Sequence, residues 1–412
     1  MELDEKIFVQ LVNEAIGGKK CILPEDKIDW RKFLIEAKSH NLAGILYPAI
    51  ANVDTLNGPG KEFIEEWKQI ALLYGGSQLS KNMLLSTMLK AGMEKNIHLV
   101  VVKGIVLADL YPDSLLRVSG DADIFVPEEE IETAREILIE NNFTKNSNKE
   151  VDCEETYYHK NGLVIELHSR LWEEKEGRKL QILESMNITQ NEKLCKIKIG
   201  TDELWTLGVT EHFIYLIYHM VKHFFVSGIG LRHLTDIVLY MKKYKEKIDF
   251  EYFWRMMEKL EYTEFCVNVF YLCVEYFELD ESAIPEKYKR NREIEESILN
   301  DILAAGVFGG KTIDRWKSGR ILRTYYENEE KKAPKNKFWL LIKFLFPKQQ
   351  ELSHQAVENQ EYSSVIVIAW FQRIFYLLKK WKKDKRRCSM KKRVDCASDR
   401  IELLKKINLI KD

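Results

Sequence analysis

The sequence predicts an α+β protein in which a small α/β domain with a mixed sheet is embedded between N-terminal and C-terminal helical regions. Glycine and proline are sparse, with 20 and 8 among 412 residues, which favours long helices over a turn-rich β-sandwich. Apolar residues follow helical spacing up to about residue 95 and again from about residue 205. Between these stretches lie short β-branched runs, which indicate strands.

These changes of period divide the chain into four expected parts. They are an N-terminal helical region (1–95), the α/β domain (96–203), a helical domain (204–330) and a C-terminal helical and basic tail (331–412). Apolar residues make up 45% of the chain and charged residues 31%, which excludes a wholly disordered protein. The seven cysteines contain no CxxC pair, so we expect neither a zinc knuckle nor a redox motif.

The N-terminal region predicts helices with clear boundaries. Asp29 is placed to cap a helix that begins near Trp30. The loop Gly58-Pro59-Gly60 precedes a long helical pattern over residues 61–95. In the α/β domain we expect a buried strand over 97–102 and a turn at Lys103-Gly104.

Further elements of the α/β domain follow in order. A short helical segment (105–110) precedes a second strand (120–127) and a helix (128–141) whose first turn is acidic, which suits the helix dipole. The strand signal then returns on both sides of Asn161-Gly162, which is a typical hairpin turn. The order of strand, helix, strand, helix and hairpin indicates a small α/β unit.

Two carboxylates on one predicted strand are the strongest candidates for chemistry. Asp121 and Asp123 are two residues apart, so their side chains point to the same face. Neighbouring carboxylates repel each other unless a cation lies between them, and Mg²⁺ prefers oxygen ligands. Glu166 adds a third carboxylate if its strand lies beside the first, which is a ligand set for two metals and an in-line attack on phosphorus. The alternative is that the two aspartates end a loop and Glu166 faces solvent.

Several segments together resemble a known family. They are Val102-Lys103-Gly104, Leu110-Tyr111-Pro112-Asp113, the stretch 116–126 (LRVSGDADIFV), Ile165-Glu166-Leu167-His168, and His219-x-x-x-His223 followed by Leu231-Arg232 and Asp236. This pattern resembles the bacterial uncharacterised nucleotidyltransferase family, a branch of the polymerase-β-like nucleotidyltransferase superfamily. The motifs lie between about residues 100 and 240. The resemblance extends over most of the chain, because the family also has helices on both sides of the α/β domain.

The resemblance implies a Mg²⁺- or Mn²⁺-dependent enzyme that moves a nucleoside monophosphate from an NTP to an unidentified acceptor and releases pyrophosphate. Asp121, Asp123 and Glu166 would be the metal ligands and catalytic residues, with Glu166 acting as a ligand or as the base. The residues expected to bind the nucleotide are Lys103, Gly104, Arg117, Gly120, His223, Arg232 and Asp236. The superfamily's glycine-serine turn is replaced here by Lys103-Gly104-Ile105, whose backbone donors and ammonium would hold the triphosphate.

Several roles remain open from the sequence. Arg117 either clamps a phosphate or pairs with Asp113 at the surface. His219 and His223 have the i, i+4 spacing of a helical metal pair, but no HExxH glutamate is present. They either pack against the α/β domain with hydrogen bonds, or His223 lines the pocket with Arg232 and Asp236. Because the turn has no serine, a second hypothesis is a non-catalytic nucleotide-binding or scaffold protein that keeps the fold.

The charge pattern bears on partners and location. Residues 379–393 carry ten Lys/Arg and one acid, so the rest of this chain of net charge −1 is mildly acidic, which argues against a nucleic-acid partner. The apolar stretch 365–378 is too short for a bilayer core, at about 21 Å as a helix. The alternatives for this stretch and the basic run are that they pack on the body, contact a membrane surface peripherally, or bind nucleic acid or another acidic partner. The N-terminus has no signal-peptide core, and we expect a cytoplasmic bacterial protein without a transmembrane span.

Overall fold

The computed structural model describes residues 3–309 except 26, 52, 54–57, 147–152 and 174–175, together with short pieces between 311 and 375 and residues 390–410. Most of the apolar segment 338–347, part of 365–378 and the basic run up to residue 389 lie outside the described residues. The role of this tail therefore stays a prediction. Within the described part of the chain, no helix has the length and apolar character needed to cross a membrane.

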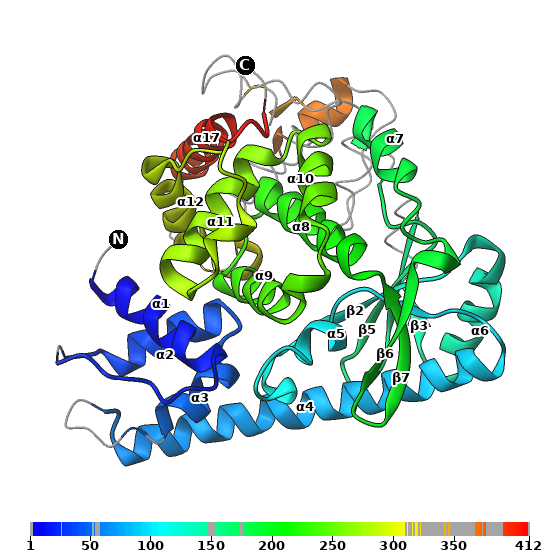
Figure 1. Cartoon of the computed structure of the whole chain (residues 1–412), viewed down its shortest axis with the longest axis horizontal. Coiled ribbons are helices and arrows are strands. Elements are labelled where there is room, and N and C mark those ends of the chain that lie inside the picture. Colours follow the sequence, from blue (N-terminus) through cyan, green and yellow to red (C-terminus); the bar gives the residue numbers. More distant parts are fainter. Residues whose placement is uncertain are drawn as a thin grey trace.

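The described residues of the N-terminal region form helices, as the sequence predicts. They are α1 (Leu3–Ile16), α2 (Trp30–Ser39), α3 (Ala43–Ala51) and α4 (Lys61–Glu94). Asp29 caps α2 by accepting hydrogen bonds from the backbone amides of Arg31 and Lys32, both at 3.1 Å. Helix α4 has 34 residues and runs along one side of the molecule, from α1–α3 to the sheet (Figure 1).

The described strands form one mixed sheet in the order β3-β4-β5-β2-β1-β7-β6. Their bounds are β1 (Val100–Val101), β2 (Asp121–Phe125), β3 (Thr144–Lys145), β4 (Glu154–Tyr158), β5 (Val164–His168), β6 (Leu194–Ile199) and β7 (Asp202–Leu207). The pairs β2–β5 and β1–β7 are parallel, and the other pairs are antiparallel. This confirms the α+β fold class with a mixed sheet, and the Asn161-Gly162 turn does join β4 to β5.

The hairpin of β6 and β7 differs from the expected pattern. The sequence predicts helix from about residue 205, whereas β7 continues to Leu207 and α8 (Val209–Val226) begins two residues later. Gly200 turns the hairpin with a φ of 60°, in the left-handed region that favours glycine. The hairpin extends the sheet beyond β1, because β7 pairs with β1 in parallel.

The two faces of the sheet have different partners. On one face Val101, Ala122, Ile124, Ile165 and Leu167 pack in one apolar cluster with residues of α4 and of α6 (Ile131–Glu140). On the other face Val100, Val102 and Phe125 join the large core that contains α8. Since side chains alternate along a strand, Asp121, Asp123, Glu166 and His168 share this second face.

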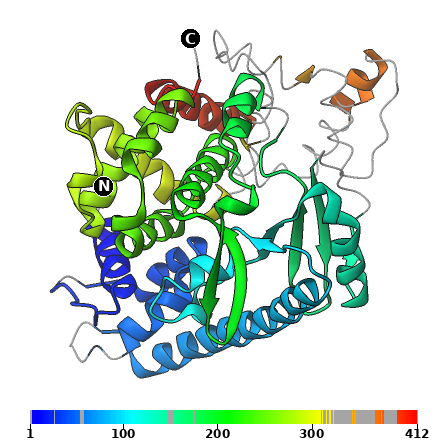
Figure 2. The ribbon, with the colours of Figure 1, turned by 45° about the vertical axis from the view of Figure 1, so that its right-hand side comes forward.

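Other helices of the described residues form the body beside that second face (Figures 1 and 2). They are α9 (Leu231–Tyr244), α10 (Phe250–Lys259), α11 (Thr263–Phe277), α12 (Arg292–Ala305) and α17 (Met390–Lys406). Two further helices are α5 (Ile105–Ala108), which follows β1, and α7 (Arg178–Ser185), which precedes β6. Helix α8 is buried along most of its length and carries aromatic and histidine side chains toward the sheet. The sheet and α8 together therefore enclose the charged residues described next.

Candidate active site

The pairing of β2 with β5 brings two of the predicted carboxylates side by side. The strands run parallel, and Asp123 is in register with Glu166. Asp121 is in register with Val164, two residues earlier on both strands. The aspartates therefore lie on a strand, not at the end of a loop, and Glu166 is half-buried and not on the open surface.

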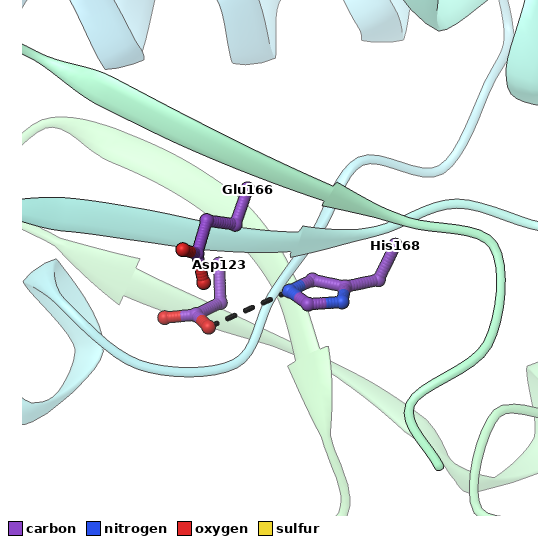
Figure 3. Close-up of side chains that lie close together, drawn as sticks. All are labelled: Asp123, Glu166 and His168. Atoms are coloured by element: carbon purple, nitrogen blue, oxygen red, sulfur yellow. Dashed lines mark ion pairs between the residues drawn. The ribbon is translucent and has the colours of Figure 1, made fainter. Parts of the chain in front are cut away.

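A cluster forms around this pair. One ligand atom each from Asp123, Glu166 and His168 lie within 4.8 Å of one another (Figure 3). The Nε2 atom of His168 is 3.5 Å from Oδ1 of Asp123. Asp123 is only 2% exposed, and His168 is 9% exposed. Such a mixed set of carboxylate oxygens and an imidazole nitrogen is chemically suited to a divalent metal ion.

The ammonium group of Lys103 lies on the same carboxylate. Its Nζ is 2.7 Å from Oδ1 of Asp123. Burial alone would raise the pKa of Asp123, but the charge of Lys103 and the contact with His168 hold that pKa well below its usual range. Asp123 is therefore ionised near neutral pH, as a metal ligand must be.

Two histidines of α8 lie next to Lys103, because His219 contacts its ammonium group and His223 contacts His219. The Nε2 atom of His219 is 2.6 Å from Lys103 Nζ, and 2.9 Å from Nε2 of His223. Burial lowers the pKa of both histidines well below the usual value, and nearby lysines lower it further. Both rings are thus neutral near pH 7, and Nε2 of His219 can accept a hydrogen bond from the ammonium group. The histidines pack against the sheet with hydrogen bonds, which was one of the alternatives left open by the sequence.

Helix α8 also covers the carboxylates with Tyr215, which is 3% exposed. The pKa of Tyr215 is raised well above its usual value, first by burial and then by the negative charges of Asp123, Glu166, Glu154 and Asp121. Glu154 is in register with His168 on β4, so it belongs to the same face. This face of the sheet therefore carries four carboxylates, and a concentration of negative charge of this kind favours a bound cation.

Arg117 pairs with Asp236, a partner that the sequence did not suggest for it. Arg117 is 3% exposed and does not pair with Asp113, whose carboxylate accepts from the backbone amide of Leu115. Its Nε and Nη2 each lie 2.7 Å from an oxygen of Asp236, and its Nη1 donates to the carbonyl oxygen of Gly104. The guanidinium fork is therefore occupied by protein partners, which fits a positioning role for this pair beneath the Lys103-Gly104 turn.

The other predicted nucleotide-binding residues lie around the same turn. Gly104 has a φ of 63° and precedes α5, whereas Gly120 is exposed with open space where a Cβ would be. Arg232 of α9 donates from Nη1 to the carbonyl oxygen of Val118 at 2.7 Å. The structure thus brings these residues to one side of the DxD strand, while their contact with a nucleotide remains a prediction.

Sequence reasoning did not single out His168, Glu154 or Tyr215 as site residues. A readable signal existed for His168, because it lies two residues after Glu166 on the same strand and must share its face. Glu154 and Tyr215 reach the site through strand pairing and helix packing across long separations, which no local pattern reveals.

Comparison with known proteins adds one finding. A family model described as uncharacterised nucleotidyltransferase matches residues 26–278, which include every element from α2 to α11. Neither a curated protein nor a solved structure matches the chain. The matched region spans more than half of the chain and contains all the residues of the carboxylate face.

Proposed function

The chain belongs to the uncharacterised nucleotidyltransferase family, and on this premise we propose that it transfers a nucleoside monophosphate from an NTP to an acceptor hydroxyl or similar group. The oxygen or other nucleophile of the acceptor forms a bond to the α-phosphorus of the NTP. The bond from that phosphorus to the bridging oxygen breaks, and pyrophosphate leaves. The observation that carries this proposal is the pairing of Asp123 with Glu166 on one buried face of the sheet.

The carboxylates have distinct roles in this proposal. Asp123 and Glu166 hold a divalent cation, and Asp121, at the more exposed end of β2, meets the cation that accompanies the triphosphate. When bound, these cations supply charge that stabilises the transferring phosphoryl group. Glu166 lies on the same face as Asp123 and is the base that takes the proton that the acceptor loses.

Lys103 and its turn bind the triphosphate. The positive φ of Gly104 turns the backbone directly after the ammonium-bearing residue, so backbone amides and the Lys103 side chain lie close together. Neutral His219 supports the ammonium by accepting a hydrogen bond from it, since its Nε2 lies 2.6 Å from Lys103 Nζ. Arg117 and Asp236 position this turn through the carbonyl oxygen of Gly104.

The proposal is tested by pyrophosphate release with each of the four common NTPs and a mixed pool of small acceptors. We expect Glu166→Gln and Asp123→Asn to lower turnover by at least about a hundredfold. Asp113→Asn, which alters only the cap of a surface turn, serves as the matched control and retains wild-type turnover. Because Asp123→Asn also removes the counter-charge of Lys103, circular dichroism confirms the fold of each variant. Retained turnover in Glu166→Gln and Asp123→Asn contradicts the proposal.

A second candidate is a nucleotide-binding protein without turnover. It is favoured by the Lys103–Asp123 ion pair, since the ammonium group takes a carboxylate oxygen that a metal ion would use. It predicts nucleotide binding without any pyrophosphate release, even with divalent cations and a full acceptor screen. The two candidates therefore differ in one measurable product.

A further inference from the structure

We infer that His168 is a metal ligand and that the ion held with Asp123 and Glu166 is a first-row transition ion, of which Mn²⁺ is the probe. This inference rests on the proposed function and names the ion class and a ligand that the three-carboxylate pattern does not include. Its starting point is that one ligand atom each of Asp123, Glu166 and His168 lie within 4.8 Å of one another.

The burial of His168 supports this role. Its Nε2 atom is buried, and it forms no hydrogen bond with any atom of the described residues. Burying a polar atom without a hydrogen bond destabilises the folded protein, so its retention calls for a compensating partner. Nε2 points toward Asp123 (Figure 3), at 3.5 Å from Oδ1, which is longer than a good hydrogen bond and leaves the nitrogen lone pair available.

Asp121 and His168 flank the central pair at opposite ends. Residues 164, 166 and 168 of β5 point to the same face, and Glu166 lies directly beside Asp123. The neighbour of Asp121 on β5 is Val164, and the neighbour of His168 on β2 is Phe125. His168 has a ligand atom within 4.8 Å of those of Asp123 and Glu166, whereas Asp121 is not part of this group of three.

The donor set decides the class of ion. Mg²⁺ prefers an all-oxygen environment and sheds its waters reluctantly, whereas imidazole nitrogen suits Fe²⁺, Ni²⁺, Cu²⁺ and Zn²⁺, and Mn²⁺ is the weakest binder of the same first-row series. Two oxygens and one nitrogen therefore favour these ions over Mg²⁺. The surrounding negative charge of Asp121 and Glu154 adds affinity for any divalent cation but no selectivity.

The test is Mn²⁺ binding to the metal-free full-length chain, followed by electron spin-echo envelope modulation. We expect nitrogen-14 modulation from a directly bound imidazole in the wild type and in His98→Asn. His98 is a matched control because it also lies beside a carboxylate, Glu130, at 3.4 Å, but away from the site. His168→Asp converts the donor set to oxygen only and should remove the modulation.

Competition with Mg²⁺ gives a second readout. In His168→Asp, the Mg²⁺ concentration that displaces half of the bound Mn²⁺ should fall on the order of tenfold relative to the wild type. Absence of nitrogen modulation in the wild type, absence of Mn²⁺ binding, or an unchanged Mg²⁺ concentration in a folded His168→Asp each overturns the inference. Mg²⁺-dependent pyrophosphate release without nitrogen modulation would sink this inference and leave the proposed function standing. Nitrogen modulation without turnover would support His168 as a ligand and contradict the proposed function.

Discussion

Arg117 and Asp236 are 119 positions apart in the sequence and form a two-pronged ion pair inside the protein, with both N–O distances at 2.7 Å. Arg117 precedes β2, and Asp236 lies on α9, so the pair joins the sheet to the helical body. Tyr111 donates a further hydrogen bond to Asp236 at 2.7 Å. The guanidinium holds the pKa of Asp236 below its usual range, although burial alone would raise it.

Replacing Asp236 by Asn should therefore destabilise the protein strongly. The variant leaves the charge of Arg117 buried without its counter-charge, and the loss of one partner of such a pair costs about 3–5 kcal/mol. Asp280→Asn is the matched control, because Asp280 pairs with Lys245 at the surface and should change stability little. Urea denaturation measures both variants, and equal effects would contradict a structural role for Arg117–Asp236.

Gly104 and Gly120 should respond differently to alanine. Gly104 has a φ of 63°, a conformation that alanine adopts only with strain, so Gly104→Ala should lose about 1–2 kcal/mol of stability. Gly120 has open space at the Cβ position, and Gly120→Ala should leave the free energy of unfolding unchanged. Thermal denaturation of both variants tests this, and a larger loss in Gly120→Ala would refute the assignment of the strained turn.

Lys103→Met should affect metal and nucleotide in opposite directions. The ammonium group competes with a cation for Asp123, so its removal should tighten Mn²⁺ binding in the absence of nucleotide. The same change removes a positive charge from the triphosphate site, so NTP binding should weaken. Lys222→Met is the control, since Lys222 of α8 pairs with Glu173 instead of Asp123. Calorimetry measures both affinities, and parallel changes would show that Lys103 has only one of these roles.

The buried His212 predicts a loss of stability in acid. Burial lowers its pKa to about 4, whereas an unfolded histidine titrates near 6.5. Below pH 6.5 the unfolded chain binds the proton first, so this contribution is complete above pH 6.5 and is lost as the pH falls toward 4. The difference corresponds to about 3 kcal/mol. His212→Asn should flatten the fall in unfolding free energy between pH 6.5 and 4.5, and an unchanged slope would contradict this account.

Local signals explain which parts of the fold could be predicted. The Asp29 cap, the long helical pattern of α4 and the Asn161-Gly162 turn each depend on a few neighbouring residues, and the structure contains all three features. The β6–β7 hairpin was missed, although Ile197 and Ile199 alternate with lysines before Gly200. Its place in the sheet depends on pairing with β1, about a hundred residues earlier.

The site was predictable in part for the same physical reason. Asp123 and Glu166 each lie on a strand with recognisable alternation, so a shared face could be anticipated once their strands were neighbours. The register that leaves Asp121 beside Val164 is a tertiary property and has no local sequence signal. Arg117 finds its partner on α9 rather than at nearby Asp113 because the folded core brings α9 beneath the turn.

The most direct test of the central claim is a binding titration of ATP, GTP, CTP and UTP, with and without divalent cation, on the wild type and on Asp121→Asn/Asp123→Asn. We expect at least one nucleotide to bind the wild type in a cation-dependent manner. The carboxylates of β2 and β5 repel the negative triphosphate unless a cation lies between them. The double variant should lose this binding. Failure of all four nucleotides to bind the folded wild type would contradict the assignment of this face as a nucleotidyltransferase active site.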